Sequence, residues 1–123
     1  QVKLWFEEEG RPVFGEGRYR LLKTIEREGS ISKAAKKLNM SFKSAWAHLG
    51  RAEENLGIKL LERTRGGSGG GFTVLTNRAK ELLRMYERLN EEVNEYTEKK
   101  FAALRLYPDS RVRITEEWSN TEG

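Results

Sequence analysis

A chain of 123 residues is long enough for one domain with a modest core, and its 37% hydrophobic and 34% charged residues suit a folded protein with a heavily charged surface. The chain has no cysteine and one histidine, His48, which excludes disulfides, thiolate zinc sites, cysteine nucleophiles and multi-histidine metal clusters within one subunit, so we expect no metal and no cofactor. The net charge is +4, no run of about 18 apolar residues could span a bilayer, and glutamates stand where a signal peptide needs basic residues, so we expect no membrane contact and a cytoplasmic location.

The first predicted elements are a short hairpin and a helix. Residues 2–15 alternate apolar and polar side chains around a turn at residues 9–12, which predicts two brief strands with one face buried. From about Gly17 to Glu28, apolar residues recur on one side of a helix, and Gly29 follows as a C-terminal cap.

A helix-turn-helix pattern occupies the centre of the chain. A capping serine, Ser30 or Ser32, begins a short helix whose inward face has the spacing i, i+3, i+4, i+7 at Ile31, Ala34, Ala35 and Leu38. Ser41 then caps a third helix that covers residues 42–56 and closes at Gly57. One side of this helix forms an apolar stripe of Phe42, Ala45, Leu49, Ala52 and Leu56.

Two further strands and a long helix complete the predicted fold. Residues 58–64 and 72–76 have the pattern of strands on either side of the glycine-rich segment 66–71. Thr76 suits the N-cap of a helix that runs to about Leu104, with a heptad seam for pairing with a second copy at Leu82, Tyr86, Leu89, Val93 and Tyr96. We therefore predict a mainly α protein with a small β component: a winged helix-turn-helix domain at 1–76, a dimerisation helix at 77–104 and a tail at 105–123 with no assigned role.

The basic residues concentrate where the helix-turn-helix lies. Residues 16–65 hold twelve Lys or Arg against six Glu, so a polyanion would meet this segment first. The second helix of such a pair protrudes enough to enter the major groove of DNA, which is about 12 Å wide. Its side away from the apolar stripe carries the candidates for base contacts, of which the first two are the strongest: Lys43, Ser44, Ala47, His48 and Arg51. Ser32, Lys33 and Ser41 lie at helix starts, where hydroxyl and N–H groups can hold phosphates.

The alternative for this face is a solvated charged surface, but its coincidence with a helix-turn-helix pattern and a basic hairpin favours DNA contact. In that hairpin, Arg63, Thr64 and Arg65 precede the glycines, where a wing would follow the sugar-phosphate backbone or probe the minor groove. A nucleotide-binding loop is disfavoured because no Gly-Lys-Ser/Thr follows these glycines. Trp46 is either an edge of the core or a DNA contact, with packing favoured, and His48 lacks the partner residues of a metal site or a catalytic base.

An ordered series of motifs in this chain is shared with two related families. The stretch GSISKAAKKLNMSFKSAWAHLGRAEENLGIKLLERT, followed by glycines and LTNRAKELL, resembles the DNA-binding domain of LysR-type regulators. The chain is still more similar to the N-terminal domain of ModE-type molybdate-responsive regulators, through PVFGEGRYRLLKTIEREGSIS, the SFKSAW run and the GGSGGG segment, over about residues 3–100. This resemblance implies a winged-helix dimer with a wing at 63–73 that includes Thr73, and with major-groove residues Ser41, Phe42, Lys43, Ser44 and Ala47.

The leading hypothesis is a sequence-specific, homodimeric regulator of transcription that reads double-stranded DNA with the helix at 42–56 and contacts the backbone or minor groove with the wing at 63–73. The alternatives are an architectural DNA binder of low specificity and a winged-helix module for an acidic protein partner. An enzyme is disfavoured because no nucleophile, base and orienting group recur at interpretable spacing. The effector domains of both families are too large for the residues after 104, so we expect no small-molecule effector site in this chain.

Overall fold

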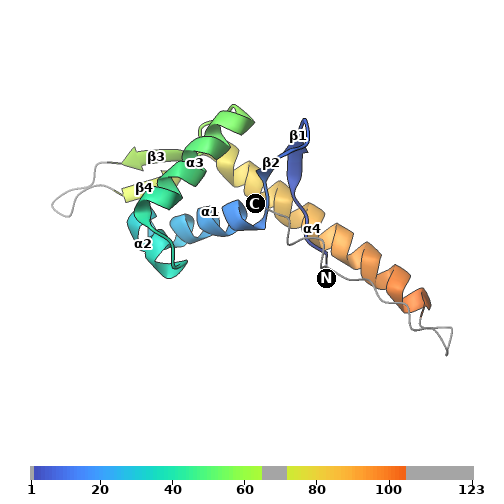
Figure 1. Ribbon diagram of the computed structural model, residues 1–123. Helices are drawn as coiled ribbons and strands as arrows, with labels where there is room; N and C mark the ends of the chain where they lie inside the picture. The colour runs from blue at the N-terminus through green and yellow to red at the C-terminus, as the bar shows by residue number, and fades with distance from the viewer. Residues whose placement is uncertain (1, 65–71, 105–123) are drawn as a thin grey trace.

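The computed structural model describes residues 2–64 and 72–104 (Figure 1). The first half of the chain forms β1 (Phe6–Glu8), β2 (Arg11–Phe14), α1 (Glu16–Glu28), α2 (Ile31–Lys37) and α3 (Phe42–Leu56). The remainder forms β3 (Leu61–Thr64), β4 (Phe72–Leu75) and α4 (Asn77–Leu104). This arrangement confirms the predicted winged-helix elements, whereas the predicted arginine at 65, the glycine-rich segment and the tail at 105–123 lie outside the described residues.

Both sheets are two-stranded antiparallel hairpins. In the first, Phe6 pairs with Phe14 and Glu8 with Arg11. The turn residues Glu9 and Gly10 have φ angles of 51° and 79°, which is the left-handed pair that a tight hairpin turn needs. The turn is therefore shorter than the sequence predicts, because Arg11 and Pro12 belong to β2. The second hairpin pairs β3 with β4 along their whole lengths.

The helices begin and end at the caps that the sequence predicts. The side-chain oxygen of Ser30 accepts a hydrogen bond from the N–H of Lys33 at 3.2 Å, so Ser30 rather than Ser32 caps α2. Ser41 caps α3 by accepting from the N–H of Ser44 at 3.0 Å, and Thr76 caps α4 by accepting from the N–H of Ala79 at 3.1 Å. These caps fix where each helix starts and therefore which side chains face outward.

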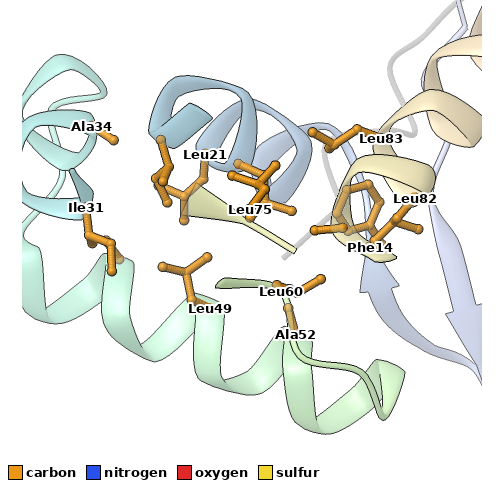
Figure 2. Packing of buried hydrophobic residues seen from close by; sticks show 14 of the residues in the cluster. Phe14, Leu21, Ile31, Ala34, Leu49, Ala52, Leu60, Leu75, Leu82 and Leu83 are labelled. Atoms are coloured by element: carbon orange, nitrogen blue, oxygen red, sulfur yellow. The ribbon is translucent and has the colours of Figure 1, made fainter. Parts of the chain in front are cut away.

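The core lies between α1, α2, α3, β4 and the first half of α4. Figure 2 shows Leu21, Leu49 and Leu75 converging from α1, α3 and β4. Ala34 and Ala45 are completely buried, so small side chains occupy the packed interior of α2 and α3 and leave room for close helix contact. Phe42 departs from the predicted stripe, because 47% of it is exposed while Ala45, Leu49 and Ala52 are buried.

An aromatic cluster joins the first half of α4 to the hairpin and α1. The ring of Tyr86 lies 5.0 Å from that of Tyr19, 5.4 Å from that of Phe14 and 5.8 Å from that of Phe6. The Tyr86 hydroxyl donates to the carbonyl oxygen of Leu4 at 2.7 Å. The Tyr19 hydroxyl in turn donates to the Glu87 carboxylate, which is next to Tyr86 in α4. These contacts attach the first half of α4 to the hairpin and α1.

The cluster corrects the predicted dimerisation seam. Leu82 and Tyr86 are 8% and 4% exposed, so the chain's own core covers them and they are unavailable to a partner. Leu89 and Tyr96 are 37% and 64% exposed, and Val93 is half-buried. Figure 1 shows the C-terminal half of α4 extending away from the other elements. None of the helices in the described part of the chain is long and apolar enough to cross a membrane.

Candidate nucleic-acid interface

The outward face of α3 carries most of the predicted base-contacting residues. Lys43, Ala47 and Arg51 are exposed, and they lie on the side of α3 opposite to its buried alanines and leucine. Ser44 and His48 are half-buried at one edge of this face. The predicted set is therefore brought together on one helix, with Lys43 in its first turn.

Polar groups surround the N-terminal ends of α2 and α3. Ser32 and Lys33 are exposed in the first turn of α2, and Ser41 is exposed at the start of α3. The Ser41 oxygen accepts the capping hydrogen bond, so its hydroxyl hydrogen is directed elsewhere and can donate to a phosphate. The three residues thus have the exposure that a role in phosphate contact requires.

A surface aromatic pair connects α3 to the wing strand β3. Phe42 and Trp46 meet edge to face with ring centroids 6.1 Å apart, and the Arg63 guanidinium lies 5.4 Å from the centre of the Trp46 ring. Because 45% of Trp46 is exposed, its indole does not lie at the edge of the core, as the favoured prediction had it. It packs instead at the surface, against Phe42 and Arg63. The i, i+4 spacing of Phe42 and Trp46 was the sequence signal for this pair.

The wing residues divide between outward and inward positions. Arg63 is exposed, and the arginine at 65 lies outside the described residues. The prediction that the Thr73 side chain contacts DNA is wrong, because Thr73 is only 8% exposed. Its N–H donates to the carbonyl oxygen of Gly29 at 2.9 Å. Its inward position follows from the alternation of β4, in which Thr73 and Leu75 share the buried side. Thr64 lies in β3, opposite Phe72.

A third basic residue, absent from the predicted set, lies beside His48 and Arg51. The Arg18 guanidinium donates to the carbonyl oxygen of Val13 at 2.5 Å, which attaches it to β2, and it lines the same cleft as His48 and Arg51. Burial, together with the guanidinium of Arg51, lowers the pKa of Arg18. Burial and the charges of Arg51 and Arg18 likewise hold the pKa of His48 below its ordinary value of 6.5. No spacing in the sequence indicates that Arg18 lies near these two residues, because its position depends on how α1 packs against α3.

The profile of one known family matches residues 17–80, which is more than half of the chain and includes the whole helix-turn-helix and wing region. The family is described as "Bacterial regulatory helix-turn-helix protein, lysR family". The chain belongs to this family. The resemblance inferred from the sequence motifs is thereby confirmed, and the family is one of regulatory proteins rather than enzymes.

Relatives of this lysR-family chain include regulators named ModE. It is 49% identical over 72 residues to "Transcriptional regulator ModE" of Haemophilus influenzae, a match that covers 58% of this chain and 28% of that protein. It is 38% identical over 91 residues to "Molybdenum transport protein ModE" of Azotobacter vinelandii, covering 65% of this chain and 34% of the relative. The chain therefore spans about a third or less of the length of these relatives.

Solved structures support the fold assignment for the lysR-family chain. "Crystal Structure of BenM_DBD/benA site 1 DNA Complex" is 26% identical with a TM-score of 0.51, and the match covers 72% of this chain and 98% of that one. "Crystal structure of full-length CbnR complexed with the target DNA complex" is 25% identical with a TM-score of 0.55, covering 72% of this chain and 29% of that one. The winged-helix arrangement is thus shared with both.

Proposed function

We propose that this chain is the DNA-binding part of a transcriptional regulator that reads the major groove with α3. The observation that carries the proposal is the exposed face of α3, where Lys43, Ala47 and Arg51 project from a helix whose other side is fixed in the core. The names of the relatives and the DNA in the titles of the similar structures support it. Since bacterial DNA lies in the cytoplasm, this function also implies that compartment.

Each part of the interface has a chemical role in this proposal. Lys43 donates hydrogen bonds to base acceptors in the major groove, and the Ala47 methyl group makes room for close approach or contacts a thymine methyl. Ser32, Lys33 and Ser41 hold phosphates, while Arg63 lies against the backbone or the minor groove. The Trp46 ring holds the Arg63 guanidinium, so the aromatic pair sets the position of the wing relative to α3.

We further propose that two copies pair through the part of α4 that follows the aromatic cluster. Leu89, Val93 and Tyr96 leave apolar surface along this part of the helix, and Tyr96 is the most exposed of them. We call these three residues the apolar strip. A two-fold dimer would place two recognition helices in successive major grooves about 34 Å apart, so the target site is a palindrome.

The decisive experiment compares a selected DNA site with random duplex at one stated salt concentration. We expect the wild-type chain to prefer the selected site by about 10³-fold or more. Lys43→Ala should weaken binding to the selected site by about tenfold and relax base preference at one position. Lys99→Ala is the matched control, since Lys99 is exposed on the far part of α4 and should leave DNA binding unchanged.

Two results would contradict parts of this proposal. Equal affinity for selected and random duplex would indicate an architectural DNA binder of low specificity. Unchanged affinity and base preference in Lys43→Ala would remove Lys43 from its assigned role. Binding to neither duplex would reject the function itself.

A further inference from the structure

A cleft of about 530 Å³ lies beside the proposed DNA-reading helix, between the β1–β2 hairpin, the first turns of α1, the turn before α3 and the middle of α3. One part of its wall is apolar and includes Trp5, Phe14 and Met40. Another part carries the guanidinium groups of Arg18 and Arg51 and the imidazole of His48. We call this hollow the basic cleft. Its volume is that of a small-molecule site.

The charges in the basic cleft are unbalanced. Its lining contains no Asp or Glu, and Arg20, the remaining basic residue of the lining, is neutralised by Glu16 at 2.7 Å. In the described part of the chain, no carboxylate lies within 4.0 Å of the guanidinium of Arg18 or Arg51. Two like charges therefore stand near each other without a counter-charge, which is an arrangement that an anion would stabilise.

The arrangement is held in place by the fold. Arg18 is fixed by its hydrogen bond to Val13, and Arg51 and His48 project from neighbouring turns of α3. These three side chains therefore come from two helices that pack against one another. A group that binds between them needs little rearrangement of the protein, because its partners are already positioned.

We propose that the basic cleft binds an oxyanion group, a phosphate or a carboxylate, through Arg18, Arg51 and His48. The group belongs either to the DNA backbone or to a small free anion, and the DNA source alone rests on the proposed function. The apolar wall suits a free anion with a ring-sized apolar body, since a backbone phosphate would leave that wall empty. A free anion would occupy Arg51 and His48 of α3 and so compete with DNA.

His48 gives the cleft a built-in reporter. It is the single histidine of the chain, so its ring signals in a nuclear magnetic resonance spectrum are unambiguous. The charges that act on it are those of Arg51 on α3 and Arg18 on α1; the lining also holds Arg20 of α1, which is paired with Glu16, and the hairpin and α2 contribute no charged residue to it. A bound anion opposes both guanidiniums and must therefore raise the pKa of His48.

The first experiment titrates the full chain with phenyl phosphate in the absence of DNA. We expect saturable shifts of the His48 ring and Trp5 indole signals, with a raised pKa for His48, and weaker binding of inorganic phosphate, which lacks the apolar body. Arg51→Gln should weaken phenyl phosphate binding about tenfold, because a charge-assisted partner is lost. Arg84→Gln removes an exposed charge from α4 outside the cleft and should change nothing.

Arg18→Gln tests the second cation, and circular dichroism checks that losing the Val13 hydrogen bond leaves the chain folded. If Arg18→Gln does not fold, Arg51→Gln, which keeps that hydrogen bond, decides whether phenyl phosphate binds in the basic cleft.

The second experiment measures binding to random duplex at several salt concentrations. If phenyl phosphate binds in the first experiment and Arg18→Gln keeps the wild-type affinity for duplex, the anion is a small free molecule. If phenyl phosphate does not bind but Arg18→Gln weakens duplex binding and lowers the salt slope by about 1, the anion is a backbone phosphate. If phenyl phosphate does not bind and Arg18→Gln keeps the wild-type affinity for duplex, the proposal is overturned. A wild-type chain that binds no duplex rejects the proposed function while leaving the first experiment decisive for the cleft.

Discussion

Gly50 is an exposed glycine in the interior of α3, where alanine would form a more stable helix. An added Cβ at this position would meet no atom within 4 Å, and the backbone needs no left-handed conformation there. The fold itself therefore gives no reason for glycine. Gly50 lies on the same outward side as Lys43 and Ala47, where the absence of a side chain permits the proposed DNA partner to approach the helix backbone closely.

We expect Gly50→Ala to raise the free energy of unfolding by about 0.5–1 kcal/mol, because alanine loses less backbone entropy in a helix. The same substitution should weaken DNA binding, since the added methyl group stands on the DNA-facing side. Urea unfolding and a duplex-binding assay measure the two effects. A variant that is both more stable and equally tight in DNA binding would show that Gly50 does not lie at the interface.

The depressed pKa of His48 predicts a stability that depends on pH. Because the folded chain holds this pKa below 6.5, the unfolded chain takes up a proton first as the pH falls. The free energy of unfolding is therefore unaffected by His48 above about pH 6.5 and decreases as the pH falls below that value. We expect urea unfolding between pH 7.5 and 5.5 to show a steeper loss of stability in the wild type than in His48→Gln. Equal slopes would mean that His48 titrates alike in both states.

At the residue scale, the sequence predicted exposure better than it predicted contacts. Lys43, Ala47 and Arg51 were placed correctly by helical period, because the period relates them to Ala45 and Leu49 on the opposite side. The burial of Thr73 could also have been predicted, since it stands two residues before Leu75 in a strand. The position of Arg18 near Arg51 could not have been predicted, because it depends on how α1 packs against α3.

At the scale of elements, α4 has two parts with different surroundings. The part that ends at Glu87 is covered by the core and by the aromatic cluster around Tyr86, and the part from Leu89 onward presents the apolar strip. A heptad spacing describes both parts equally and carries no information on what covers each position. The sequence therefore predicted the helix and its cap at Thr76 but assigned Leu82 and Tyr86 to the wrong partner.

Two alanine substitutions in α4 separate these roles. Tyr86→Ala should lower the free energy of unfolding by about 3–5 kcal/mol, because it removes a buried ring and leaves a cavity beside Phe14. Leu89→Ala, one turn further along the helix, should cost about 1 kcal/mol or less when measured at a dilution where the chain is monomeric. Urea unfolding followed by far-ultraviolet circular dichroism gives both values. Similar losses in the two variants would show that the cluster does not stabilise the monomer.

At the scale of the whole molecule, the apolar strip leads to a prediction about assembly. We expect the wild-type chain to sediment as a dimer and Leu89→Glu to sediment as a folded monomer, because a carboxylate in the seam would be buried without a partner. Ala102→Glu introduces the same charge at an exposed position about 220° around the helix from Leu89 and should leave the dimer intact. Analytical ultracentrifugation decides between these outcomes. A Leu89→Glu dimer would place the interface elsewhere.

The attachment of Tyr86 has a mechanical consequence for such a dimer. The aromatic cluster attaches α4 to the winged-helix domain at Tyr86, and the apolar strip begins only three residues later, at Leu89. The rotation about the helix axis between these two points therefore sets the direction in which the domain faces in the proposed dimer. One residue inserted between Tyr86 and Leu89 would rotate the domain by about 100° relative to the dimer axis, whereas seven would return it to within about 20°. In the proposed dimer, the angle at which the two recognition helices face the DNA thus depends on the number of residues between Tyr86 and Leu89.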